Sequence, residues 1–261
     1  MTKLRFDLIG DIAIVRGTAE NLEKMAESIL QSNRRVKVVL AKAGPVRGDF
    51  RLCKLAFVAG ERRTVTVHRE NGCLFHVDLA SVHFSPRLVT ERGLVAEEVK
   101  PGETILNMFG GIGTFSIEMA QRNSSVMVFN VDINPEATRF CLKSVLANQL
   151  RGRVITVLGD AKETASILFP IRIDRILLPL PEMSGKYLPG AIHVLKRDGI
   201  IHYYDLIGVG KQESCTEVVL HKAKMLSAKY GLISRESRIV KSVAPRLYLV
   251  SLELQNSECY S

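Results

Sequence analysis

Glycines and aspartates at the ends of predicted strands carry the first chemical signal in the sequence. Gly110, Gly111 and Gly113 follow an apolar run at 104–109, and glycines in a strand-to-helix turn let the backbone approach a ligand closely. Asp132 ends the next run, about 20 residues later, where a carboxylate accepts both hydroxyls of a ribose. Asp160 ends the third run, where such a site holds an adenine edge. A packing turn and helix caps explain the same residues without a ligand, so both interpretations stay open.

Two further features bear on which cofactor binds and on where catalysis takes place, namely Ser116 and a proline-rich loop. The nicotinamide fingerprint GxGxxG needs Gly or Ala at position 116, where the sequence has Ser116. This difference favours S-adenosylmethionine over NAD as the cofactor. Pro179, Leu180 and Pro181 end the fourth predicted strand as a rigid, non-helical loop. Such a loop is either catalytic or a plain strand terminator.

The elements that position these residues follow from the hydrophobic pattern. From about residue 104, predicted strands alternate with helices, and a strand pair at 235–244 and 246–255 closes the chain. This alternation predicts an α/β fold with a doubly wound, mostly parallel, Rossmann-like sheet and a ligand at the carboxyl ends of its strands. The first 90 residues show period-two strands and one amphipathic helix at 20–31. We therefore predict a smaller N-terminal α+β domain, 1–90, and a second domain, 91–261.

Composition and charge limit the class of protein. The chain has 261 residues, of which 46% are hydrophobic and 24% charged, as in ordinary globular proteins. Its net charge of +9 is concentrated between Arg34 and Arg69, with ten basic residues against two acidic ones. This basic segment predicts a polyanionic partner. No apolar run is long enough to span a membrane and no signal peptide is evident, so we expect a cytoplasmic protein.

The cysteines and histidines give no sign of a metal or disulfide framework. The five cysteines are scattered without a CxxC pair, which argues against zinc and disulfides. The six histidines show no metal-ligand spacing, and His68 and His202 are interpreted as structural. We therefore predict no metal site.

Several runs of residues, in this order along the chain, form a recognisable set: FDLIGDIAIV, GDFR, HRENGCLFHVDL, SPRLVTERG, NMFGGIGTFSI, VDINPEA, GDAKE, DRILLPLP, GIIHYY and RIVKSVAPR. Together they resemble the archaeal and eukaryotic tRNA (guanine-37-N1)-methyltransferases. The resemblance covers nearly the whole chain and implies a class I S-adenosylmethionine-dependent methyltransferase domain behind an N-terminal RNA-binding domain. It also implies that an extra N-terminal recognition module of many members is missing, because the chain begins directly at the FDLIGDIA run.

The resemblance also implies roles for individual residues. For the cofactor these are Met108, Phe109, Gly111 and Gly113 on the methionine side, Asp132 and Ile133 at the ribose and adenine, Asp160 and Ala161 at the adenine edge, and the loop residues Leu180 and Pro181. Glu91 is the implied general base, and Arg51 faces the target guanine. Among the basic residues, Arg87 and Arg92 are further candidates for contacting tRNA phosphates or for orienting the carboxylate. Lys241 and Arg246 are candidates for extending the tRNA-binding basic surface. The expected partner is the anticodon loop of tRNA, bound by a monomer without any membrane association.

The chemistry of the target independently favours a carboxylate and an arginine. N1 of guanine carries a proton at neutral pH, so its attack on a methyl group needs a base and a cation that stabilises charge on O6. Glu91 and Arg51 meet these needs. As alternatives, Glu91 is a solvated acid at a helix start and Arg51 belongs to the basic surface.

The sequence departs from the family at two positions. Asn107 replaces an aspartate before the glycine loop, and Pro179 replaces an asparagine expected to touch the target base. The change at Pro179 leaves open a wyosine-pathway reaction, either methylation of a tricyclic guanine derivative or aminocarboxypropyl transfer from the same cofactor. A binding module without catalysis is a further alternative. Because Glu91 is retained, guanine methylation stays the leading prediction.

Overall fold

A seven-stranded sheet forms the centre of the molecule. The computed structural model describes residues 6–168, 170 and 172–257, and the sheet has the strand order β12-β13-β11-β10-β7-β8-β9. β7 to β11 pair in parallel, whereas β13 runs antiparallel to both β11 and β12. The strands are β7 (Thr104–Asn107), β8 (Met127–Asp132), β9 (Val154–Leu158), β10 (Ile173–Leu178), β11 (Leu195–Gly208), β12 (Leu232–Ala244) and β13 (Leu247–Asn256).

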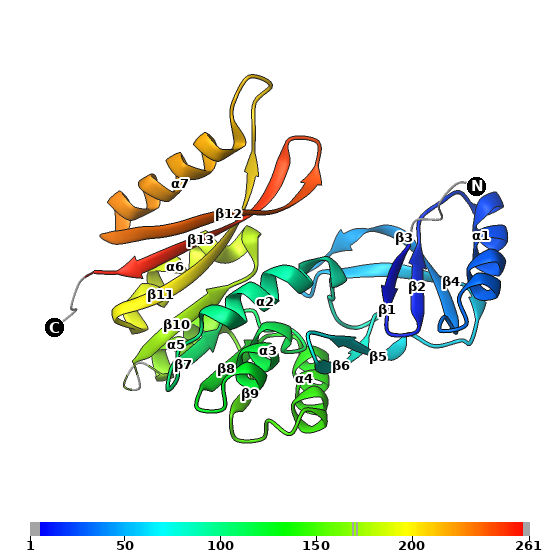
Figure 1. Ribbon diagram of the computed structural model, residues 1–261, viewed down its shortest axis with the longest axis horizontal. Helices are drawn as coiled ribbons and strands as arrows, with labels where there is room; N and C mark the ends of the chain where they lie inside the picture. Colours follow the sequence, from blue (N-terminus) through cyan, green and yellow to red (C-terminus); the bar gives the residue numbers. More distant parts are fainter. Residues whose placement is uncertain (1–5, 169, 171, 258–261) are drawn as a thin grey trace.

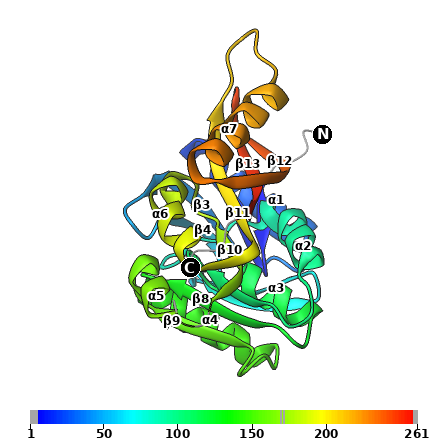
Figure 2. The same ribbon diagram turned by 90° about the vertical axis from the view of Figure 1, so that its left-hand side faces the viewer.

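Helices cover both faces of this sheet. One face carries α2 (Val89–Glu98), α3 (Thr114–Arg122) and α4 (Pro135–Ala147), and the other carries α5 (Ala161–Leu168), α6 (Pro181–Val194) and α7 (Cys215–Tyr230) (Figures 1 and 2). Ile176, Leu177 and Leu178 of β10 are fully buried, because a parallel strand between two helical layers has no solvent face. The predicted doubly wound α/β fold is confirmed.

A smaller lobe precedes the sheet (Figure 1). Its four-stranded sheet has the order β1-β2-β3-β4, with β1 (Asp7–Ile9), β2 (Ile12–Val15), β3 (Val38–Arg47) and β4 (Leu52–Gly60). The helix predicted at 20–31 is α1 (Ala19–Ser32), whose Ala26 and Ile29 pack against Val39 on one face of this sheet. Ile9, Ile14 and Leu40 on its other face belong to the same core as α3 and α4.

The hairpin β5 (Val65–Glu70) and β6 (Cys73–Asp78) joins the two lobes. Its His68 Nδ1 accepts a hydrogen bond from the Gly10 backbone, 3.1 Å away. On the other side, the amide of Asn148, directly after α4, bonds to both backbone groups of Leu74 at 2.9 and 2.6 Å. A short 3₁₀ turn, η1 (Pro86–Leu88), then leads into α2. The division between residues 90 and 91 stays a prediction.

Two further observations concern disulfide bonds and membrane-spanning helices. Cys53, Cys73, Cys141 and Cys215 are free thiols, and Cys259 lies outside the described residues. Among the described residues, no helix is long and apolar enough to cross a membrane.

Candidate active site

Gly111 and Gly113, in the loop between β7 and α3, are glycines for different structural reasons. Gly113 caps α3 with φ +85°, and a Cβ there would lie 2.6 Å from Cys141 Sγ. Gly111 also has a left-handed φ, +53°, but a Cβ there would meet no atom within 4 Å. Gly113 is therefore required by packing, whereas Gly111 faces open space from which a ligand can approach the backbone.

Asp132 holds this loop against the end of β8. Its Oδ2 accepts a hydrogen bond from the Gly111 backbone at 2.7 Å, and its Oδ1 accepts one from Asn134 at 2.8 Å. Burial raises the pKa of Asp132, although both backbone donors oppose the shift. Each oxygen keeps a free lone pair, so the carboxylate can also accept two ribose hydroxyls. Ile133 beside it is 46% exposed and available to an adenine ring.

A buried polar relay explains the residues at positions 107 and 116. The Asn107 amide donates to Ser116 Oγ at 3.1 Å, and Ser116 donates to Asn130 Oδ1 at 2.6 Å. Asn130 in turn donates to the Gly111 carbonyl at 3.3 Å. An aspartate at position 107 has no N–H to donate when ionised, so Asn107 and Ser116 act together to support the glycine loop.

Asp160 combines a helix cap with a side-chain contact. Its Oδ1 accepts from the Lys162 backbone at 2.7 Å at the start of α5, and its Oδ2 accepts from the Tyr187 hydroxyl, also at 2.7 Å. Burial and the bond to Asp160 raise the pKa of Tyr187 to about 12. The Tyr187 ring meets Phe109 edge-on at 4.9 Å. Tyr187 was missed by sequence reasoning because nothing in the spacing of α6 marks it. Met108 and Ala161, also predicted at the cofactor, are buried beneath this surface.

The Pro179–Pro181 loop ends β10 and starts α6. Leu180 has non-helical angles, φ −118° and ψ 88°, and Pro181 occupies the first turn of the helix. Ser184 Oγ donates to the carbonyls of Leu178 and Leu180 at 2.7 and 2.9 Å. Among the described residues, no group donates to the Pro179 carbonyl. That carbonyl is therefore available to a ligand at the end of the strand.

Glu91 is buried rather than solvated at the start of α2. It is 4% exposed, and its Oε1 accepts a hydrogen bond from the Tyr204 hydroxyl at 2.7 Å. Arg238 Nη2 lies 3.5 Å from the same oxygen. Tyr204 lies 113 and Arg238 147 residues away in sequence, and neither was predicted, because Tyr204 follows an apolar strand pattern and Arg238 lies in a charge-rich run.

Arg51 connects the N-terminal lobe to the proline loop. It lies between β3 and β4 with φ +53°, and its Nη1 pairs with Glu182 Oε2 of α6 at 2.7 Å. The two side chains are 31% and 51% exposed, so this pair is solvated and can exchange for another partner. The structure thus brings Arg51 to the loop that contains Pro179.

Arg92 does not lie where a phosphate contact requires it. The side chain is 2% exposed, and its Nε lies 2.6 Å from Glu70 Oε1 and 3.4 Å from Glu118 Oε1. It does not contact the Glu91 carboxylate either. The predicted tRNA contact at Arg92 is therefore wrong, because two carboxylates from other elements bury this guanidinium in an ion network.

The other predicted tRNA contacts have accessible side chains. Arg87 is exposed and pairs with Asp7 at 2.9 Å, and Arg246 is exposed at the turn between β12 and β13. Burial and the nearby charges of Arg87, Arg92 and Arg51 lower the pKa of Lys241. Lys241 therefore lies among arginines of both lobes.

Comparisons with known proteins identify the family of the chain. The family model described as the TRM5/TYW2 methyltransferase domain matches residues 66–231. The chain is 34% identical to the Pyrococcus abyssi tRNA (guanine(37)-N(1))-methyltransferase Trm5b, over 97% of this chain and 74% of that protein. It is 33% identical to the Saccharolobus solfataricus tRNA 4-demethylwyosine(37)-methyltransferase Taw21, over 96% of this chain and 93% of that protein.

A solved structure extends the similarity to three dimensions. The complex of aTrm5 and tRNALeu superimposes with a TM-score of 0.85 at 31% identity, covering 97% of this chain and 72% of that one. The glycine loop, Asp132 and Glu91 all lie within the residues matched by the family model. The chain belongs to the TRM5/TYW2 methyltransferase family.

Proposed function

We propose that the protein transfers a methyl group from S-adenosylmethionine to N1 of guanine 37 in tRNA. The observation that carries the proposal is the buried Glu91 carboxylate, held by Tyr204 in a protein that also brings Arg51 to the end of β10. A carboxylate and a guanidinium are the two groups that N1 methylation of guanine needs. The Trm5b relative, similar over nearly the whole chain, supports the same reaction.

The residues at the glycine loop fit S-adenosylmethionine. Gly111 leaves open space beside its backbone, and Asp132 lies directly beneath it with lone pairs for the ribose hydroxyls. Phe109 lines the methionine side and Asp160 lies at the adenine edge, with the buried Met108 and Ala161 supporting them from beneath. When bound, the cofactor supplies an electrophilic methyl group.

The protein's own residues then act on the guanine. Glu91 removes the N1 proton, a contribution of about 10²–10⁴ in rate. Arg51 leaves Glu182 and stabilises the negative charge that develops on O6. The free Pro179 carbonyl accepts a hydrogen bond from the exocyclic amino group, which replaces the contact expected of an asparagine. Most of the remaining barrier is lowered by aligning N1 with the methyl group.

Basic side chains of the N-terminal lobe bind the tRNA. Within the segment from Arg34 to Arg69, the exposed basic residues that make no ion pair with described residues are Arg34, Arg35, Lys37, Arg47, Lys54, Arg62 and Arg69. Arg87, Lys241 and Arg246 extend this surface toward the anticodon loop. Affinity for tRNA is expected to fall steeply as salt rises, because phosphate contacts release counterions. The 1–90 division, the monomeric state and the cytoplasmic location stay predictions.

The test uses methyl-labelled S-adenosylmethionine and two unmodified tRNA transcripts, with guanine or adenine at position 37. We expect label only on the guanine transcript, as 1-methylguanosine. The Glu91→Gln variant is expected to lose turnover while cofactor affinity, measured by calorimetry, stays unchanged. Transfer of label at the wild-type rate by this variant would show that Glu91 is not the base.

A second candidate function is methylation of 4-demethylwyosine at the same position. Pro179 favours this second function because it replaces the family's asparagine, whose side chain is expected to touch the target base. In addition, the identity to Taw21 nearly equals that to Trm5b. A tRNA carrying 4-demethylwyosine at position 37 separates the two. Faster transfer to this tRNA than to the guanine transcript would establish the second function, and carboxyl-labelled cofactor would detect aminocarboxypropyl transfer.

A further inference from the structure

A band of polar side chains crosses the sheet beneath α2. Tyr204 of β11, Ser251 of β13 and Arg238 of β12 are paired across neighbouring strands. A second row lies two residues further along each strand. In it, His202 of β11 pairs with Glu253 of β13, which in turn pairs with Glu236 of β12. Because side chains alternate between the faces of a sheet, both rows point to the same face, and the apolar Ile201, Val250 and Leu252 point to the other.

The helix α2 adds two carboxylates to this band. Glu91 and Glu98 are seven residues apart, or about two helical turns, and so lie on one side of α2. Arg238 bridges them, with Nη1 2.8 Å from Glu98 Oε1 and Nη2 3.5 Å from Glu91 Oε1. The helix that carries the proposed base is therefore attached to β12 at two points.

Both contacts to Glu91 end on one carboxylate oxygen. The Tyr204 hydroxyl and the Arg238 guanidinium approach Oε1, while among the described residues Oε2 accepts no hydrogen bond. Tyr204 is itself fixed, because its ring centroid lies 5.9 Å from that of Phe115 and its backbone is paired with Ser251 of β13. These contacts set the rotation of the carboxylate and leave one oxygen free to take a proton.

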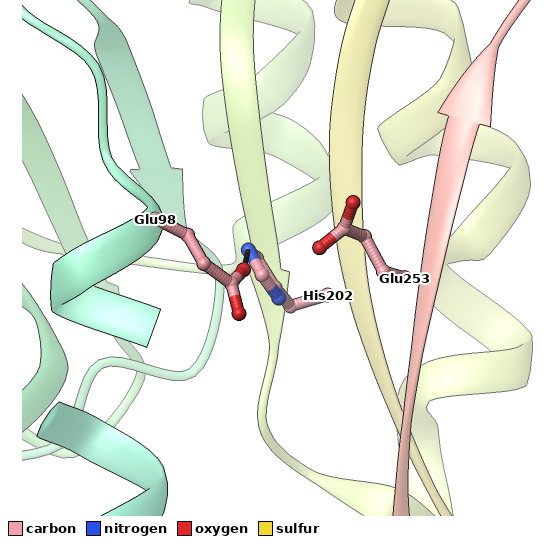
Figure 3. Close-up of side chains that lie close together, drawn as sticks. All are labelled: Glu98, His202 and Glu253. Atoms are coloured by element: carbon pink, nitrogen blue, oxygen red, sulfur yellow. Dashed lines mark ion pairs between the residues drawn. The ribbon is translucent and has the colours of Figure 1, made fainter. Parts of the chain in front are cut away.

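His202 and Glu253 of the second row lie beside Glu98 (Figure 3), and Arg175, which contacts His202, anchors the end of α2 by donating to the Glu98 carbonyl at 2.9 Å. Ligand atoms of Glu98, His202 and Glu253 lie within 4.8 Å of one another, as they would in a metal site. However, Arg175 Nη1 lies 2.6 Å from His202 Nε2 and uses the lone pair that a metal would need. Burial and the neighbouring Glu98 raise the pKa of Glu253. Arg175 and Arg238 thus supply the positive charge that these groups require.

We propose that Tyr204 and Arg238 are positioning residues for Glu91, which hold its Oε1 so that Oε2 meets N1 of the target base. The inference rests on the proposed function, in which Glu91 is the base. It gives β11 and β12, which lie far from the cofactor loop in sequence, a role in positioning the proposed base.

The test compares Tyr204→Phe with the matched control Tyr203→Phe. Tyr203 points to the opposite face of β11, where its hydroxyl lies 3.4 Å from Asp205. For Tyr204→Phe we expect kcat to fall about tenfold or more, as on loss of a hydrogen bond to a charged group, with unchanged KM for tRNA and cofactor. Tyr203→Phe is expected to keep the wild-type kcat. Arg238→Met should lose kcat similarly, and Arg238→Lys should recover part of it.

A second readout does not depend on turnover. In protein carrying ¹³C-labelled glutamate carboxyls, the Glu91 resonance is identified by its loss in Glu91→Gln. We expect it to move in Tyr204→Phe and to stay in Tyr203→Phe. An unmoved resonance together with wild-type kcat would overturn the positioning role. If the wild type methylates no guanine 37, the proposed function fails, while the resonance still decides whether Tyr204 holds Glu91.

Stoichiometric zinc in the purified protein, lost in Glu253→Gln, would overturn the assignment of the second row as an anchor.

Discussion

The two halves of the candidate site are built over different distances along the chain. In the cofactor half, Ser116 contacts Asn130, Gly111 contacts Asp132 and Asp160 contacts Tyr187 across 14, 21 and 27 residues. In the base half, Glu91 meets Tyr204 across 113 residues and Arg238 across 147. Arg51 meets Glu182 across 131 residues.

This difference indicates how each half depends on the rest of the molecule. The cofactor half consists of adjacent strand–loop–helix units, whose backbone amides and turn conformations form locally. The base half exists only when the N-terminal lobe and the last strands are both in place. Substitutions in the base half should therefore change transfer without changing cofactor affinity.

The largest expected effect separates the buried Arg92, next to Glu91 in sequence, from the exposed Arg87. Arg92→Ala leaves Glu70 and Glu118 buried without their cation, so we expect a loss of about 3–5 kcal/mol in the free energy of unfolding. Arg87→Ala, the matched exposed arginine, should cost less than about 1 kcal/mol. Urea unfolding measures both. Equal stability of the two variants would contradict the buried network, while weaker tRNA binding is expected of Arg87→Ala.

Arg51→Ala tests whether the link between the lobes is catalytic. We expect the transfer rate to fall about 10²–10³-fold, as on removal of a donor to a developing oxyanion. The exposed pair with Glu182 contributes little to stability, so the melting temperature should barely move. Single-turnover kinetics measure the transfer rate, and a thermal melt measures stability. The Glu182→Gln variant is the control, because it removes the ion pair and keeps Arg51. A stable variant with a normal transfer rate would remove Arg51 from the site.

In the cofactor half, two glycine variants should separate packing from binding. Gly113→Ala forces a Cβ against Cys141 at a left-handed φ, which we expect to cost about 2–4 kcal/mol in unfolding free energy. Gly111→Ala meets open space and should cost about 1–2 kcal/mol. Calorimetry should nevertheless show weaker cofactor binding for Gly111→Ala, by tenfold or more. Unchanged cofactor affinity there would place the ligand elsewhere.

A pH dependence of stability is expected at the buried Glu118 of α3. Burial and the nearby Glu70 raise the pKa of Glu118 to about 7, although Asn71 donates to it at 2.7 Å. Because this value lies above the ordinary 4.5, the carboxyl contributes stability at acidic pH that is lost as pH rises through about 7. Relative to Glu118→Gln, the wild type should therefore lose up to about 3 kcal/mol between pH 5 and 8. Parallel stability curves for both proteins would contradict this.

Local patterns were sufficient for the elements and for the strand-end positions of the cofactor half, but not for Tyr187. Alternation of apolar residues predicted the strands of both sheets, and the α1 helix was confirmed within one or two residues at each end. The glycines at 110–113, Asp132 and Asp160 were predicted at strand ends, and the structure places them there. These predictions succeeded because side-chain periodicity and turn conformation depend on neighbouring residues.

The rest was decided by tertiary structure. The sequence alone determined which residues end the strands and that positive charge gathers in the first lobe. It did not determine that Tyr204 and Arg238 reach Glu91, nor that Arg92 is buried between Glu70 and Glu118. The physical reason is that burial and ion pairing of a side chain depend on elements more than 20, and often more than 100, residues away. A tyrosine in an apolar strand and an arginine in a charged run have no local feature that reveals such partners.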